Sequence, residues 1–256
     1  MRRTEPTPLL WRYGAARGTR TYVLAPFAGG SAYAMGDWPR HLLREGEGAL
    51  VLQYPGRGPR AAEPQAASLA ALAAEAADAV LAHSAGPVVL VGHSLGGVLA
   101  HSLALCLEDA GRPVELLAAS AARPPAAARL DADRVLAMTD GEWLEELTRY
   151  STFDPGLLED PEVLDLIVPV LRADYLMLAR HRPAHRPVSC PVLAVGGAGD
   201  TWVTGGHLAA WSEWTTGGLT ARTLPGGHFF YRDDLTALAR LIHGALDGDH
   251  AREVYR

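Results

Sequence analysis

Short apolar runs alternate with helical patterns along most of the chain, and this alternation restricts the fold more than any other feature. The runs that predict strands are Tyr22 to Ala25, Ala49 to Gln53, Val88 to Val91, Val114 to Ala119, Val192 to Val195 and Thr220 to Leu224. Apolar residues at helical spacing predict helices over Ser68 to His83, Gly97 to Asp109 and Leu235 to Leu246, the first with Ser68 as N-cap. This order is typical of an α/β fold with a mostly parallel central sheet and flanking helices.

The alternation stops between Arg123 and Pro187. Inside this stretch the helical patterns are Val135 to Met138, Trp143 to Leu147 and Val163 to Leu178. We expect a helical insertion at about residues 123–187 that lies over the sheet edge as a candidate lid. The alternative is a packing cap without a role in substrate choice. Because α/β folds of 256 residues are routinely one domain, we expect residues 1–256 to form a single domain.

Composition argues against several classes of function. The net charge of −6 and the pI near 5.9 give no electrostatic reason to bind nucleic acid or an anionic membrane. All 23 basic residues are arginine, which excludes Schiff-base chemistry, pyridoxal phosphate attachment and a P-loop lysine. No apolar run of signal-peptide length follows the basic residues at the start, and nowhere do roughly 18 apolar residues run uninterrupted, so we expect a cytoplasmic protein. Cys106 and Cys190 lie in apolar contexts, which favours buried free thiols over a disulfide.

The sequence Gly92-His93-Ser94-Leu95-Gly96 fits the pattern G-x-S-x-G in the context that this motif requires. It follows an apolar strand directly and opens a predicted helix, which is the strand, sharp turn and helix of a nucleophile elbow. Glycines at 92 and 96 let the backbone turn tightly and leave the Ser94 hydroxyl exposed. The alternative is an ordinary glycine-rich loop, but the context favours Ser94 as a nucleophile.

A serine hydroxyl needs a base to take its proton and a carboxylate to orient that base. Asp200 follows the strand Val192 to Val195 and a glycine turn, and is the predicted acid. The other position for an acid, after the strand Val114 to Ala119, has no carboxylate within reach. His228 follows the last strand after a glycine turn and is the predicted base.

Other titratable residues are given lesser roles. His93 adjoins the nucleophile but should point elsewhere and be structural, whereas His101 and His207 are interpreted as core or surface residues. We expect the side chains of His181 and His185, at the border of the insertion, to be solvated. Substitution of the insertion carboxylates Asp154 or Asp174 should affect turnover much less than substitution of Asp200.

An oxyanion hole is the third requirement of this chemistry. One donor is the backbone N–H after the nucleophile, here that of Leu95, and the other comes from the loop after an early strand. That loop contains adjacent glycines, and we assign its donor to Ala28, with Phe27 or Gly29 as alternatives. A plain glycine turn is the competing interpretation.

Several segments together resemble the type II thioesterases that accompany modular polyketide and non-ribosomal peptide synthetases. These segments are Pro26 to Ala32 with Trp38, Gln53 to Arg60, Gly92 to Gly97, Leu171 to Tyr175 and Pro225 to Phe230. The Tyr-Pro-Gly-Arg part of the second segment is the specific one, because the G-x-S-x-G motif is shared with many esterases. The resemblance implies an α/β-hydrolase fold, and it implies the same roles for Ser94, Asp200, His228, Ala28 and Leu95.

The resemblance also implies a substrate and partners. The substrate would be an acyl group on the phosphopantetheine arm of an acyl or peptidyl carrier protein, and hydrolysis would clear stalled or mis-primed carriers; small acyl thioesters would also react. We expect no metal and no cofactor of the enzyme's own. The residues expected to line the acyl chamber are Phe27, Trp143, Leu171, Tyr175 and Leu178. The alternatives are a general carboxylesterase or lipase-like hydrolase and a non-catalytic acyl-binding module.

The chain departs from the family pattern at two places. Ala179 and His181 stand near positions where the family often has a glutamate and an aromatic residue, and Thr201-Trp202 follows the acid where proline is frequent. The shape of the acyl pocket is therefore left open. Arg57 and Arg60 could meet carrier-protein acids or the phosphate, or could form ion pairs that stabilise the fold, and the sequence does not decide between these.

Overall fold

The computed structural model describes residues 1–150 and 160–248. Within these residues an eight-stranded sheet has the order β1-β2-β4-β3-β5-β6-β7-β8. Pairing is parallel from β4 to β8, while β2 pairs antiparallel with both β1 and β4. The strands are β1 Arg3–Thr7, β2 Leu10–Gly14, β3 Thr21–Ala25, β4 Gly48–Leu52, β5 Val88–His93, β6 Val114–Ser120, β7 Val192–Gly197 and β8 Leu219–Leu224. The mostly parallel sheet that the alternation predicts is confirmed.

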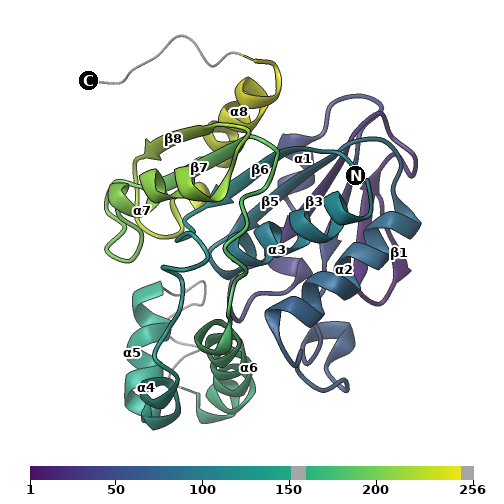
Figure 1. The fold of residues 1–256 in the computed structure, drawn as a ribbon. Coiled ribbons are helices and arrows are strands. Elements are labelled where there is room, and N and C mark those ends of the chain that lie inside the picture. The colour runs from purple at the N-terminus through teal and green to yellow at the C-terminus, as the bar shows by residue number, and fades with distance from the viewer. Residues whose placement is uncertain (151–159, 249–256) are drawn as a thin grey trace.

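Helices cover both faces of the sheet (Figure 1). Alternate strand residues point to opposite faces. Leu90 therefore belongs to the same apolar cluster as residues of α2, α3 and α7, whereas its neighbour Val91 belongs to the cluster with residues of α1 and α8. These helices are α1 Trp38–Leu42, α2 Leu69–His83, α3 Leu95–Asp109, α7 Gly205–Ala209 and α8 Leu235–Leu246, and the short 3-10 helices are η1 Ala32–Met35, η2 Gly58–Arg60, η4 Ala210–Trp214 and η5 Phe230–Arg232. Strands buried on both faces read as continuous apolar runs, which is why they were predictable.

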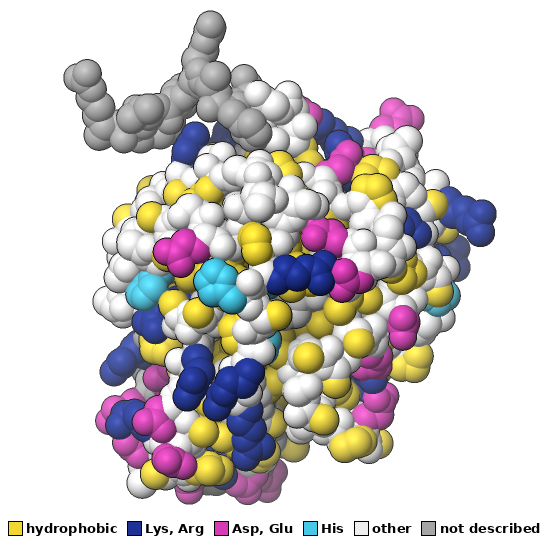
Figure 2. Space-filling view, in the orientation of Figure 1, with side chains coloured by type: hydrophobic (Ala, Val, Ile, Leu, Met, Phe, Trp, Pro, Cys, Tyr) yellow, Lys and Arg dark blue, Asp and Glu magenta, His cyan; other side chains and the backbone are white. Residues whose placement is uncertain are grey.

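The predicted insertion leaves the sheet after β6 and returns at β7. Its helices are α4 Ala132–Ala137, α5 Asp140–Tyr150 and α6 Pro161–Arg180, which form a separate layer beyond the sheet (Figure 1). They enclose a small apolar core of their own, made by Val135, Trp143, Leu147, Val168 and Leu171. Asp154 lies outside the described residues. Figure 2 shows both signs of charge over one face of the molecule, with basic side chains gathered over the region of α6.

Sequence and structure differ mainly at the start of the chain. Strands β1 and β2 were not predicted, because β1 is largely exposed and β2 mixes buried and polar residues. Helix α3 begins at Leu95, two residues before the predicted start, because the elbow leads directly into the helix. Ser68 is the N-cap of α2 as predicted, and its hydroxyl accepts a hydrogen bond from the Ala71 N–H at 3.1 Å.

Both cysteines are free, as predicted, but only Cys190 is buried, whereas Cys106 is partly exposed. Burial raises the pKa of the Cys190 thiol to about 12, so this thiol stays protonated and unreactive at neutral pH. Within residues 1–150 and 160–248, no helix has both the length and the apolar character needed to cross a membrane.

Candidate active site

The turn between β5 and α3 holds Ser94 in a backbone conformation that residues other than glycine rarely adopt. Its φ is 54° and its ψ is −118°. A side chain on Gly92 would overlap the carbonyl group of Gly96, and one on Gly96 would overlap the carbonyl group of Ala25. The two glycines therefore allow the close approach of strand and helix that brings the Ser94 hydroxyl to the carboxyl edge of the sheet.

The loops after β7 and β8 bring a carboxylate and an imidazole to this edge. Asp200 Oδ2 lies 2.8 Å from His228 Nδ1, and His228 Nε2 lies 3.0 Å from Ser94 Oγ. Asp200 Oδ1 accepts hydrogen bonds from the backbone N–H groups of Trp202 and Val203 at 2.8 and 3.1 Å. Burial raises the pKa of Asp200, but these hydrogen bonds, above all the one from His228, bring the net pKa below its ordinary value. Asp200 is thus held as a carboxylate beside the imidazole.

His93 lies next to this group without joining it. The side chain is fully buried, and Nδ1 lies 3.0 Å from the hydroxyl of Ser120 at the end of β6. Its ring centroid is 5.3 Å from that of His228. Burial and the nearby His228 hold the pKa of His93 well below its usual range, so the imidazole is neutral. This agrees with a structural role.

The other predicted histidines lie apart from Ser94. His101 is in the core against two tryptophan rings, and burial lowers its pKa to about 4. His207 accepts a backbone hydrogen bond at the start of α7, and His185 is exposed. The expectation for His181 was wrong: the side chain is partly buried rather than solvated, because it caps the carboxyl end of α6 where the chain turns back toward β7. Burial lowers its pKa.

The structure narrows the choice of oxyanion donors. Leu95 is the first residue of α3, so its N–H has no acceptor within the helix. Gly29 donates its N–H to Asp174 Oδ2 at 2.7 Å and is thereby removed from the alternatives. Phe27 and Ala28 line the same cavity as Ser94. Among residues 1–150 and 160–248, no hydrogen-bond acceptor is found for the Ala28 N–H.

Ser94 opens into a cavity of about 830 Å³. The walls come from the loop after β3, from the insertion, and from the His228 loop and the start of α8. Four of the predicted lining residues contribute, namely Phe27, Leu171, Tyr175 and Leu178. Sequence reasoning missed other apolar lining residues, among them Leu130, Ile167, Trp202 and Phe229. Trp202 and Phe229 lie within two positions of the predicted acid Asp200 and the predicted base His228. This proximity in sequence could have predicted that they line the cavity.

Comparison with known proteins decides the family. The model of the thioesterase domain family matches residues 20–246, which is most of the chain. This chain belongs to the thioesterase domain family. The chain is 33% identical to phenyloxazoline synthase MbtB of Mycobacterium tuberculosis. The matched region covers 92% of this chain but only 16% of that protein. The chain is 36% identical to thioesterase PikA5 of Streptomyces venezuelae, covering 82% of this chain and 75% of the relative.

A solved structure agrees with this assignment. The type II thioesterase BorB from the borrelidin biosynthetic cluster superposes with a TM-score of 0.83 at 31% identity, covering 95% of this chain and 99% of that one. The predicted α/β-hydrolase fold and the predicted resemblance to type II thioesterases are confirmed. A further solved structure of the same fold is ClbQ from the colibactin NRPS/PKS pathway, with a TM-score of 0.79 at 24% identity, covering 90% of this chain and 97% of that one.

One predicted lining residue does not reach the cavity. Trp143 is fully buried inside the insertion, where its ring packs 5.4 Å from that of Tyr175. The prediction that Trp143 lines the chamber was therefore wrong. The helical pattern showed an apolar face on α5 but not which side of the insertion this face meets. Trp143 instead packs in the apolar core that the three helices share.

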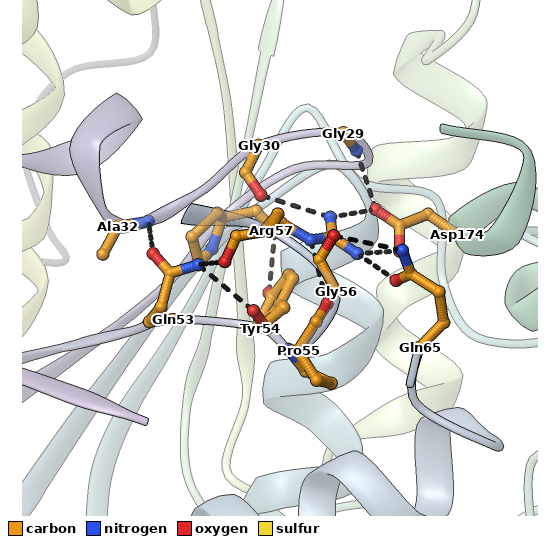
Figure 3. A network of polar contacts seen from close by, with 11 residues as sticks. Gly29, Gly30, Ala32, Gln53, Tyr54, Pro55, Gly56, Arg57, Gln65 and Asp174 are labelled. Atoms are coloured by element: carbon orange, nitrogen blue, oxygen red, sulfur yellow. Dashed lines mark hydrogen bonds and ion pairs between the residues drawn. The ribbon is translucent and has the colours of Figure 1, made fainter. Parts of the chain in front are cut away.

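The side chains of Arg57 and Arg60, in the segment Gln53 to Arg60, are both buried. Arg57 is 7% exposed and forms a two-pronged ion pair with Asp174, with Nη1–Oδ2 and Nη2–Oδ1 distances of 2.6 and 2.7 Å (Figure 3). Arg60, 6% exposed, pairs with Glu63 and Glu75 at 2.6 and 2.7 Å. Of the two interpretations left open by sequence, the structure favours internal ion pairs over contacts with a carrier protein.

Proposed function

We propose that this protein hydrolyses acyl thioesters on the phosphopantetheine arms of acyl or peptidyl carrier protein domains, and so clears stalled or mis-primed carriers of a modular synthase. The observation that carries the proposal is the hydrogen-bonded series Ser94, His228 and Asp200 at the mouth of an acyl-sized, largely apolar cavity. Membership of the thioesterase family and the likeness to a type II thioesterase support the reaction. The cytoplasmic location stays a prediction.

In the acylation step, Ser94 Oγ attacks the thioester carbonyl carbon while His228 Nε2 takes the hydroxyl proton. The carbonyl electron pair moves onto oxygen, where the N–H groups of Leu95 and Ala28 stabilise the negative charge. When the tetrahedral intermediate collapses, the carbon–sulfur bond breaks. The departing thiolate takes the proton from His228. Because a thiolate is a good leaving group, this step needs less assistance from His228 than amide cleavage would.

In the deacylation step, water loses a proton to His228 and attacks the acyl-enzyme carbonyl. The same two N–H groups hold the second oxyanion, and His228 returns the proton to Ser94 Oγ as the acid leaves. Asp200 keeps Nδ1 protonated, so that Nε2 can act as the base. These steps need neither a metal nor a cofactor of the enzyme's own, and the acyl chain would lie against Phe27, Leu171 and Leu178.

The test compares three substrates of one acyl group: the carrier-protein thioester, its N-acetylcysteamine thioester and an oxygen ester of the same acid. We expect the highest kcat/KM for the carrier-bound substrate, because binding of remote parts lowers the barrier at the reacting carbonyl. Equal or better kcat/KM for the small thioester, together with efficient cleavage of the oxygen ester, would make the protein a general carboxylesterase. Failure to turn over any of them would indicate an acyl-binding module.

A further inference from the structure

The proposed oxyanion donor lies in the loop of residues 26–32. Side chains of the segment Gln53 to Arg60, which follows β4, fix this loop. The Tyr54 hydroxyl donates to the Pro26 carbonyl at 2.8 Å, and the Gln53 side chain accepts from the Ala32 N–H at 3.0 Å. Both side chains are essentially inaccessible to solvent. The two ends of the loop are therefore held by the main body of the protein.

The middle of the loop is held from the insertion instead (Figure 3). Asp174, on helix α6, is 2% exposed. Its Oδ2 accepts hydrogen bonds from the Gly29 N–H at 2.7 Å and from Arg57 Nη1 at 2.6 Å. The same guanidinium nitrogen donates to the Gly30 carbonyl at 3.2 Å. Arg57 thus holds both the carboxylate of the insertion and the loop that this carboxylate contacts.

This contact constrains the peptide unit that follows the one carrying the Ala28 N–H. The Gly29 N–H belongs to the planar peptide unit that follows Ala28, so fixing it limits rotation at Ala28. Gly29 also has a φ of 75°, a conformation that glycine adopts easily and can also leave easily. A hydrogen bond to a carboxylate is short and strong, and is suited to holding such a peptide in one orientation.

Stability alone is a weak explanation for this ion pair. The free energy needed to desolvate two charges is about as large as the free energy gained from their attraction. Replacing a buried ion pair by well-packed apolar side chains therefore often leaves the stability of the protein unchanged. We propose that Asp174 is a positioning residue, which couples the packing of the insertion to the formation of the oxyanion hole through Gly29. The hole is complete only while α6 lies against the loop. This inference rests on the proposed function, in particular on Ala28 as a donor.

The experiment uses Asp174→Asn in the full chain, with Asp165→Asn as matched control because Asp165 is exposed on the same helix. Two acyl analogues separate positioning from binding. A trifluoromethyl ketone is attacked by Ser94 Oγ at its carbonyl carbon and forms a tetrahedral adduct whose oxyanion lies in the oxyanion hole. A thioether with CH2 in place of the carbonyl fills the chamber but has no oxygen that the oxyanion hole could bind. The kcat for the N-acetylcysteamine thioester is measured alongside.

For Asp174→Asn we expect kcat to fall about 10- to 100-fold, less than the 10²- to 10³-fold for deleting an oxyanion donor, because the donor is misdirected and not removed. The inhibition constant of the ketone should rise by the same factor, while the Kd of the thioether stays within about twofold. Asp165→Asn should resemble wild type in all three measurements.

Two results would overturn the inference: an unchanged ketone inhibition constant in a folded variant, or equal weakening of ketone and thioether. If Asp174→Asn fails to fold, the double variant Arg57→Gln/Asp174→Asn removes both charges and the same criteria apply. Failure of the proposed function is recognised separately, because wild type would then bind the ketone covalently without favouring thioesters, or would not bind it at all.

Discussion

At the scale of single residues, the site depends on Ser94 occupying a backbone conformation that the surrounding glycines make possible. The positive φ turns the hydroxyl out of the strand, and β6 stabilises the turn because the Ser94 N–H donates to the Ser120 carbonyl at 2.8 Å. The hydroxyl then meets His228 Nε2 at 3.0 Å without any rearrangement. The Ser94 hydroxyl is therefore pre-organised for its proposed role as the nucleophile.

Ser94→Ala should reduce kcat for any thioester by about 10⁴-fold or more, because the acyl-enzyme cannot form and only binding and oxyanion effects remain. A fluorophosphonate probe should label wild type at Ser94 and leave the variant unlabelled. Ser102→Ala is the control, since its hydroxyl lies further along α3 and donates to the Val98 carbonyl at 3.4 Å. Labelling at another serine would contradict the assignment.

Asp200→Asn should reduce turnover by roughly 10⁴-fold, because an amide at this position favours the wrong imidazole tautomer. The loss should exceed that of Asp174→Asn, which alters orientation and leaves the proton transfers intact. Steady-state kinetics beside the exposed Asp140→Asn variant would test this. Near-normal rates for Asp200→Asn would mean that another carboxylate orients His228.

Residues whose role depends on local sequence were predictable, and those that depend on distant partners were not. A strand pattern with nearby glycines precedes each of Ser94, Asp200 and His228. The local sequence therefore predicted that all three lie at the carboxyl edge of the sheet. Arg57 could not be assigned, because its partner Asp174 lies 117 positions away on a different element. A pairing over that distance is decided by how α6 packs, which no local pattern records.

At the scale of elements, the insertion is a small helical layer with a core separate from the two main cores. The break in the alternation of strands and helices predicted the length and the helices of the insertion. It did not predict which side chains, such as that of Trp143, pack inside the insertion. Strand β2 escaped prediction because its buried residues are interrupted by the partly buried Arg12, and because its partner β4 is remote in sequence.

Trp143→Ala should loosen the insertion, because removing a buried indole leaves a large void and costs about 3–5 kcal/mol. We expect faster protease cleavage within residues 123–187 and a lower kcat/KM for acyl thioesters. Fluorophosphonate labelling of Ser94 should persist, since the elbow lies outside the insertion. Leu166→Ala, at a position 75% exposed on α6, is the control and should change neither property. Loss of probe labelling together with protease resistance would contradict a separable insertion core.

At the scale of the whole molecule, two buried neutral histidines should make the fold sensitive to acid. The pKa of His101 is lowered to about 4 and that of His93 lies well below its ordinary 6.5, in both cases chiefly by burial. Below pH 6.5 the unfolded chain binds protons that the native state excludes, so the free energy of unfolding falls as the pH decreases. For His101 this loss begins near pH 6.5 and is complete below about pH 4.

The expected loss from His101 is about 2 kcal/mol at pH 5, from the difference between its native and unfolded pKa values. Denaturant unfolding at pH 8, 6 and 5 would measure it. His101→Gln should have a visibly flatter dependence on pH, whereas His185→Gln, at an exposed position, should follow wild type. Parallel curves for wild type and His101→Gln would show that this histidine does not contribute.

The insertion leaves and re-enters the sheet between β6 and β7, which are hydrogen-bonded neighbours. A segment anchored in this way can be exchanged in evolution without shifting any strand, because doubling a loop adds only about 0.6 kcal/mol of closure entropy. Exchange of this one contiguous segment would therefore change the part of the Ser94 cavity wall that the insertion supplies, while the sheet keeps its arrangement. The Arg57 ion pair limits this freedom: a transplanted segment that lacks a carboxylate at the position of Asp174 would leave a buried arginine without its counter-ion.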